Sequence, residues 1–118
     1  MQDFRKLVVW QQSHQLTLDI YKMASHFPKE ELYGLTSQIK RAAASVPANI
    51  AEGCGRETNG ELTRFLYIAM GSASELEYHL LLAHDLGFVE AKSYDQLNIE
   101  LIKIRRMLNN FIQKTKNQ

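Results

Sequence analysis

Glu52 and Glu75 are the first residues whose type suggests chemistry. Two carboxylates can act as general acid and base, or bridge metal ions when a histidine follows three residues later. The residues at that offset are Gly55 and Tyr78, and His79 follows Glu75 at four. We therefore expect no metal, cofactor or catalytic site. Each glutamate is expected to pair with a basic or hydroxyl group, and the sequence leaves open whether their role is structural or functional.

The segment Gly53-Cys54-Gly55-Arg56 contains the one cysteine and resembles a phosphate-binding loop in composition only. A phosphate-binding loop has the spacing G-x-x-x-x-G-K-[ST] after a strand, and this segment follows a helical pattern. A reactive thiol needs a base fixed beside it, and the sequence places no histidine or acid next to Cys54. We interpret the segment as a turn with an unreactive thiol, and predict that the chain is not an enzyme.

Basic residues concentrate near the C-terminus. Residues 101–118 contain five bases and no acid, whereas residues 61–100 contain seven acids and two bases. The candidate phosphate-binding residues are Lys103, Arg105, Arg106, Lys114 and Lys116, with Lys40 and Arg41 as further candidates. Because cations near a helix C-terminus are also favoured by the helix dipole, a solvated face is an equally good interpretation. The net charge of +1 argues against a globally basic nucleic-acid binder.

These residues must be positioned by helices, because apolar residues recur at steps of three and four along most of the chain. The pattern predicts helices over about 7–26, from 32 or 34 to 52, from 58 or 59 to 86, and from 93 onward. Capping boxes are expected at Thr58 with Glu61 and at Ser93 with Gln96. Four amphipathic helices with short turns predict a single all-α domain over 1–118, an antiparallel up-down-up-down four-helix bundle.

Pro47 lies in the middle of the second predicted helix. It lacks the N–H that would bond to the carbonyl of Ala43, and its ring crowds that turn, at a cost of about 3 kcal/mol. Since the apolar pattern keeps its phase across Pro47, we predict one helix kinked there rather than a new helix beginning at this proline. Gly53 and Gly55 are expected to end it in the left-handed conformation. The small residues from Gly71 to Ser74 are expected to let this helix and the third approach closely.

Some large residues are left outside the four apolar stripes. Trp10, Tyr21, Phe65 and Tyr67 form this group, and an exposed aromatic set is typical of subunit contacts. With Pro47 and Gly71, they are our candidates for oligomer interfaces or close packing.

The run GLTSQIKRAAASVPANIAEG at 34–53 closely resembles the signature of the four-helix-bundle family named for intervening sequences in bacterial 23S ribosomal RNA genes, also described as ribosomal-protein-like. The resemblance continues in the segments 3–7 with Trp10, 68–76 and 86–89, and so covers nearly the whole chain. Met70 departs from it, because a basic residue is expected before Gly71-Ser72.

The resemblance implies a small bacterial protein without enzymatic activity that assembles into homopentameric rings and is linked to RNA. A similar bundle, the accessory protein of diversity-generating retroelements, pairs with a reverse transcriptase, so the alternative is a protein-interaction scaffold without direct nucleic-acid binding. No signal peptide and no apolar run of about 18 residues is recognisable, so we predict a soluble cytoplasmic protein without a membrane partner.

Overall fold

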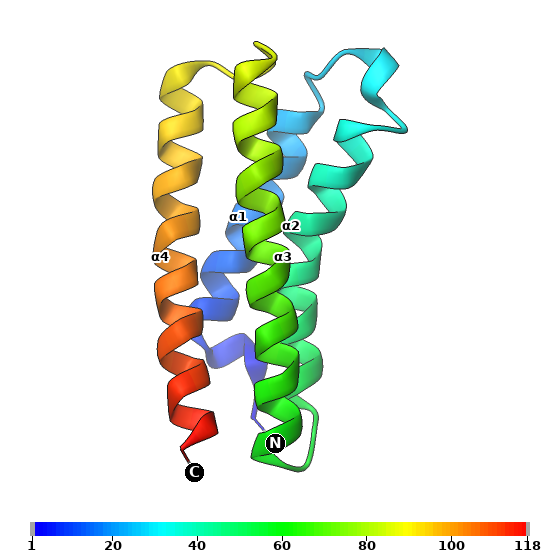
Figure 1. Ribbon diagram of the computed structural model, residues 1–118. Helices are drawn as coiled ribbons and strands as arrows, with labels where there is room; N and C mark the ends of the chain where they lie inside the picture. Colours follow the sequence, from blue (N-terminus) through cyan, green and yellow to red (C-terminus); the bar gives the residue numbers. More distant parts are fainter. Residues whose placement is uncertain (1, 118) are drawn as a thin grey trace.

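The computed structural model describes residues 2–117 and contains four long helices that run alternately up and down (Figure 1). The helices are α1 (Val8–Ala24), α2 (Leu35–Cys54), α3 (Asn59–Asp85) and α4 (Ala91–Lys116). Two short 3₁₀ turns, η1 (Phe4–Lys6) and η2 (Lys29–Glu31), precede α1 and α2. The described residues form no strand, and the predicted all-α four-helix bundle is confirmed.

Each helix directs one apolar stripe into a shared core. Neighbouring pairs are α1 with α2, α2 with α3, α3 with α4 and α4 with α1, so that α1 and α3, like α2 and α4, lie on opposite corners. Fully buried side chains come from every helix and include Ile20, Ile39, Ile50, Leu66, Leu76, Leu80, Leu101, Ile104 and Leu108. Packing on two neighbours leaves each helix one outward side, and these sides form the faces discussed below.

α2 runs without interruption through Pro47, so the alternative of a new helix beginning there is wrong. The predicted bend stays a prediction. Because Pro47 has no N–H, the carbonyl of Ala43 lacks its helical partner. The hydroxyl of Thr17 on α1 lies 3.0 Å from that carbonyl oxygen and donates to it, and lies 2.8 Å from the carbonyl oxygen of Ser13. A neighbouring helix thus supplies the donor that the proline removed.

The expected left-handed end of α2 is wrong. Gly53 is buried inside the helix, and Gly55 has φ −84°. Gly53 instead permits close approach, because a β-carbon there would lie 2.9 Å from Cβ of Phe65 on α3. The left-handed glycine is Gly87, with φ +82°, where the amide of Phe88 donates to the Ala83 carbonyl at 2.9 Å and ends α3.

The two predicted capping boxes have different outcomes. At the start of α3, the Thr58 hydroxyl accepts from the backbone amide of Glu61 at 3.2 Å, as expected. Ser93 does not cap α4, which already begins at Ala91. The physical reason is that the amide of Tyr94 donates to the Glu90 carbonyl at 2.9 Å, so the first helical turn closes on Glu90 and places Ser93 inside it.

Phe65 was predicted among the exposed aromatics and is buried, with 7% of its surface exposed. Its position on α3 faces α2, where Gly53 leaves room for the ring. Gly71 is also misassigned as a packing residue between α2 and α3, because it is exposed and a β-carbon there would meet nothing within 4 Å. Its neighbour makes that contact instead, since the hydroxyls of Ser72 and Ser45 lie 2.8 Å apart.

Candidate nucleic-acid interface

The second half of α4 carries the five predicted basic residues, and the structure divides them into paired and free groups. Lys103 Nζ lies 3.4 Å from Oε1 of Glu100 on the same helix. The Arg105 guanidinium donates to Oε1 of Glu77 on α3 at 2.5 Å, and both side chains are about one-third exposed. Arg105 therefore ties α4 to α3, and its charge is largely neutralised.

Arg106, Lys114 and Lys116 are exposed. Within residues 2–117, no carboxylate lies within ion-pair distance of these three side chains. Lys114 lines a shallow groove together with Gln2 and Leu7 of the N-terminal segment and Phe111 of α4. These three cations are the part of the predicted set that remains available to an external anion.

The free lysines lie at the end of the bundle that holds both termini and the α2–α3 turn (Figure 1). Arg5 and Lys6 in η1, Arg56 in the turn and Arg64 in the first turns of α3 add positive charge at this end. Of these, only Arg56 lies in a segment that was compared with a phosphate-binding loop, the turn at 53–56, and none was among the predicted phosphate-binding residues. The missed signal is topological, because an even number of antiparallel helices returns both termini to one end.

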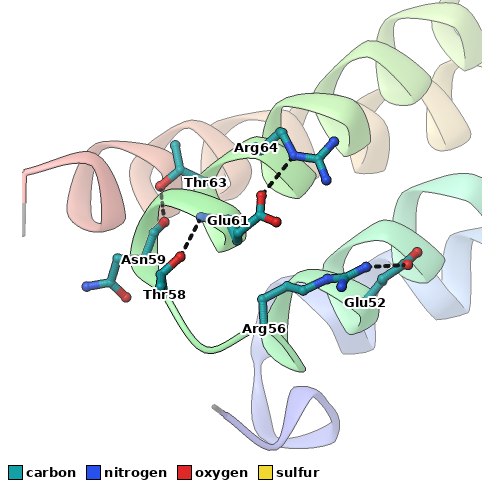
Figure 2. A network of polar contacts seen from close by, with 7 residues as sticks. All are labelled: Glu52, Arg56, Thr58, Asn59, Glu61, Thr63 and Arg64. Atoms are coloured by element: carbon teal, nitrogen blue, oxygen red, sulfur yellow. Dashed lines mark hydrogen bonds and ion pairs between the residues drawn. The ribbon is translucent and has the colours of Figure 1, made fainter.

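Figure 2 shows how the two arginines near the turn are held. Arg56 pairs with Glu52 at 3.0 Å and Arg64 pairs with Glu61 at 2.9 Å. Both guanidinium carbons also lie near the Phe65 ring, 4.7 and 4.6 Å from its centroid. The hydrogen bond from Arg64 and its charge hold the pKa of the Glu61 carboxyl below its ordinary value. Each arginine thus pairs with a glutamate three or four residues away, and both side chains stay at the surface.

Lys40 and Arg41 lie on α2, diagonally opposite α4. Lys40 Nζ lies 5.1 Å from the centroid of the Tyr21 ring on α1, and Arg41 is exposed. The structure therefore does not join these two residues to the α4 cations in one continuous surface.

The residues considered for catalysis or metal binding do not meet in one site. Glu52 pairs with Arg56 of the following turn, and Glu75 pairs with Nε2 of His79 within α3 at 3.1 Å. Within the described part of the chain, no group of three or more histidine, cysteine or acidic residues is placed to hold a metal ion. Cys54 is buried, and burial raises the pKa of its thiol and so favours the protonated form.

Comparison with known proteins identifies the relatives of this bundle. Residues 5–110, nearly the whole chain, match the family described as 23S rRNA-intervening sequence protein. The chain belongs to this family. The signature of this family was recognised at residues 34–53. These residues coincide with α2, the helix that contains Pro47.

A solved structure supports the same assignment. It is a protein of unknown function from the S23 ribosomal protein family of Bacteroides thetaiotaomicron, similar to this chain with a TM-score of 0.80 and 26% identity over 89% of this chain and 98% of that one. Among curated proteins, none is significantly similar in sequence.

This 23S rRNA-intervening sequence protein also has a larger groove, of about 580 Å³, between α1 and α4 near the end opposite the free lysines. Met23, Phe88 and Leu97 are among its apolar lining residues, and three carboxylates, those of Asp19, Glu90 and Glu100, lie along it. This excess of negative charge is the wrong sign for phosphate. No helix within residues 2–117 is long and apolar enough to cross a membrane.

Proposed function

We propose that this protein is a non-enzymatic, RNA-associated module that works as a homopentamer and binds phosphate groups through the basic half of α4. The observation that carries the proposal is the trio Arg106, Lys114 and Lys116, exposed and without a carboxylate partner among the described residues. Membership of a family named for 23S rRNA agrees with it.

Three free cations per chain predict weak binding by a single copy. A ring repeats this basic surface around its axis, and simultaneous contacts then raise the overall affinity well above that of one site. Neutralising phosphates releases counterions, so the affinity for RNA falls as salt rises, with a slope of about −0.7 per contact for a single strand. No base-reading motif is present in the sequence, so the proposed binding is insensitive to RNA sequence.

The test is binding of a labelled single-stranded RNA to the purified, nuclease-treated protein across a series of salt concentrations. The triple variant Arg106→Gln, Lys114→Gln and Lys116→Gln is expected to bind more weakly and with a shallower salt dependence. Its matched control is Lys22→Gln, Lys29→Gln and Lys92→Gln, which removes the same charge from exposed lysines near the other end. Light scattering on each sample reports whether the assembly is intact.

If the salt dependence of RNA affinity is unchanged in the first triple variant, the proposal that these three residues bind phosphate is overturned. A ring that ignores RNA even at low salt would overturn RNA association altogether and leave the protein-interaction scaffold as the better proposal. A wild-type protein that is monomeric would overturn the pentamer.

A further inference from the structure

α3 has a second apolar stripe on its outer side. Its exposed residues recur at steps of four and three: Tyr67, Gly71, Ser74, Tyr78 and Leu81. Tyr67, Tyr78 and Leu81 are 49%, 58% and 44% exposed. A helix that packs on one core needs one apolar stripe, and α3 already buries Leu66, Ala73 and Leu80 there. The second stripe therefore requires a different explanation.

α4 extends this surface beside α3. Ile99, Ile102, Arg106 and Asn109 recur at steps of three, four and three and are exposed. Met70 of α3 lines a shallow groove between the two helices with four residues of α4: Ile102, Arg105, Arg106 and Asn109. We call this surface, formed by the two stripes and Met70, the α3–α4 face. A basic residue was expected at position 70, and methionine there makes the face more apolar.

The opposite side of the bundle is formed by α1 and α2. α1 contributes Trp10, His14, Leu18 and Tyr21, and α2 contributes Ser37, Lys40, Ala44, Pro47, Ala48 and Ala51. Trp10 stacks on His14 with ring centroids 4.9 Å apart. These two rings and the small residues of α2 enclose a shallow apolar pocket of about 330 Å³. We call this surface the α1–α2 face.

Both faces contain few charges, whereas the other two sides contain many. The α3–α4 face contains Arg106 and, in its groove, Arg105, which is paired with Glu77, whereas Lys40 is the charged residue of the α1–α2 face. The side shared by α1 and α4 carries Asp19, Lys22, Glu100 and Lys103, and the side shared by α2 and α3 carries Arg41, Glu52, Arg64 and Glu75. Depletion of charge with enrichment of aromatic residues and methionine is the composition of interface cores.

We propose that the α3–α4 face of one copy packs against the α1–α2 face of the next, with the tyrosines of α3 covering the pocket beside Trp10. The inference rests on the proposed homo-oligomer and names the surfaces that build it. This contact covers Arg106, so Lys114 and Lys116 are the cations that stay free for phosphate in the assembled ring. Because the two faces are different surfaces of one chain, the contact is heterologous. It closes into a ring when each copy is rotated about a common axis by a whole fraction of a turn relative to the one before. The bundle measures 45 × 25 × 20 Å, so one long side offers about 900 Å², above the roughly 800 Å² that each partner gives a standard interface.

The test places a charge at the centre of each face without disturbing the core. Ser74→Glu changes the α3–α4 face and Ala48→Glu changes the α1–α2 face, and both residues are exposed. Gln96→Glu, an exposed residue on the charged α1–α4 side, is the matched control. We expect light scattering without RNA to give an assembled wild type and Gln96→Glu, and single 13.6 kDa chains for the other two variants. Circular dichroism checks that each variant remains helical.

Mixing the two dissociated variants tests whether the contact is heterologous. Ser74→Glu keeps an intact α1–α2 face and Ala48→Glu keeps an intact α3–α4 face, so one good contact forms between them and cannot be extended. We expect a two-chain complex at high protein concentration, containing one chain of each variant by native mass spectrometry. No complex in the mixture, or dimers of either variant alone, would overturn the heterologous contact.

The remaining outcomes separate this inference from the proposed function. If wild type is assembled and both variants stay assembled, the named faces are wrong and the oligomer stands. If wild type is monomeric, the oligomer and this inference are both overturned. RNA is absent throughout, so the phosphate-binding proposal is not tested by this experiment.

Discussion

Thr17 of α1 donates a hydrogen bond to the carbonyl oxygen of Ala43 on α2, at 3.0 Å. Ala43 is the residue whose helical partner would be the N–H of Pro47, four positions on. The contact is buried, and burying an unpaired carbonyl costs about 1–3 kcal/mol. The proline of the family signature and a threonine in another helix thus form one structural unit.

The first prediction concerns this unit. Thr17→Val keeps the shape of the side chain and removes the donor, so the free energy of unfolding is expected to fall by about 1–3 kcal/mol. In a Pro47→Ala background, residue 47 regains its N–H and pairs with Ala43, so Thr17→Val is expected to cost less there. Chemical denaturation of the four proteins at one protein concentration measures the coupling. Equal costs of Thr17→Val in both backgrounds would contradict the pairing.

The second prediction concerns the close approach of α2 and α3. Gly53→Ala would place a β-carbon 2.9 Å from Cβ of Phe65 and 3.0 Å from Cδ1 of Leu62. We expect it to lower the free energy of unfolding by about 1–3 kcal/mol through overpacking. Gly60→Ala is the matched control, because a β-carbon there meets nothing within 4 Å and alanine favours helix. Similar changes in the free energy of unfolding for Gly53→Ala and Gly60→Ala would contradict the prediction, because α2 and α3 would then move apart at little cost.

The third prediction concerns the cap of α3. Thr58→Ala removes the hydroxyl that accepts from the Glu61 amide and is expected to cost about 1 kcal/mol, whereas Thr58→Ser should keep most of the stability. Thermal or chemical unfolding of the two variants decides this. Equal losses for alanine and serine would show that the methyl group of Thr58, not its hydroxyl, is what matters.

A fourth prediction follows from the Glu61–Arg64 ion pair. Because the pKa of Glu61 is lowered from its ordinary value of 4.5, its ionised form stabilises the folded chain above that pH. This stabilisation is lost as pH falls through the folded-state pKa. The stability difference between wild type and Glu61→Gln should therefore be largest near neutral pH and shrink below about pH 4.5. Glu57→Gln, in the exposed turn, is the control, and a difference that grows in acid would reverse the sign of the linkage.

A fifth prediction concerns Cys54. The thiol is 1% exposed and burial raises its pKa, so a thiol-specific reagent is expected to label it slowly in the folded protein and fully in denaturant. The labelling rate in buffer should follow the opening of the end of α2. Rapid labelling under native conditions would indicate a reactive thiol and reopen a chemical role for it.

The apolar periodicity predicted the four helices within a few residues, because each stripe depends only on spacing along its own helix. Leu35, Ile39, Val46 and Ile50 show this directly, as all four are buried on one side of α2. The Thr58 cap was equally readable, since its partner lies three residues away. The sequence also showed that basic residues gather near the end of α4. It did not show which of them pair with a carboxylate.

Properties that depend on a neighbouring helix could not be predicted from the sequence. The sequence predicted an exposed Phe65, but in the structure Gly53, twelve positions earlier, leaves space that buries its ring. Arg105 looked like a free cation until Glu77 of α3 paired with it. The order of the helices around the core also decided which surfaces lie on opposite sides of the bundle. Sequence spacing determined which side of each helix is apolar. Only the tertiary packing decided which apolar residues are buried and which charges are paired within the chain. The reason is that burial and pairing depend on contacts between residues that are distant in the sequence.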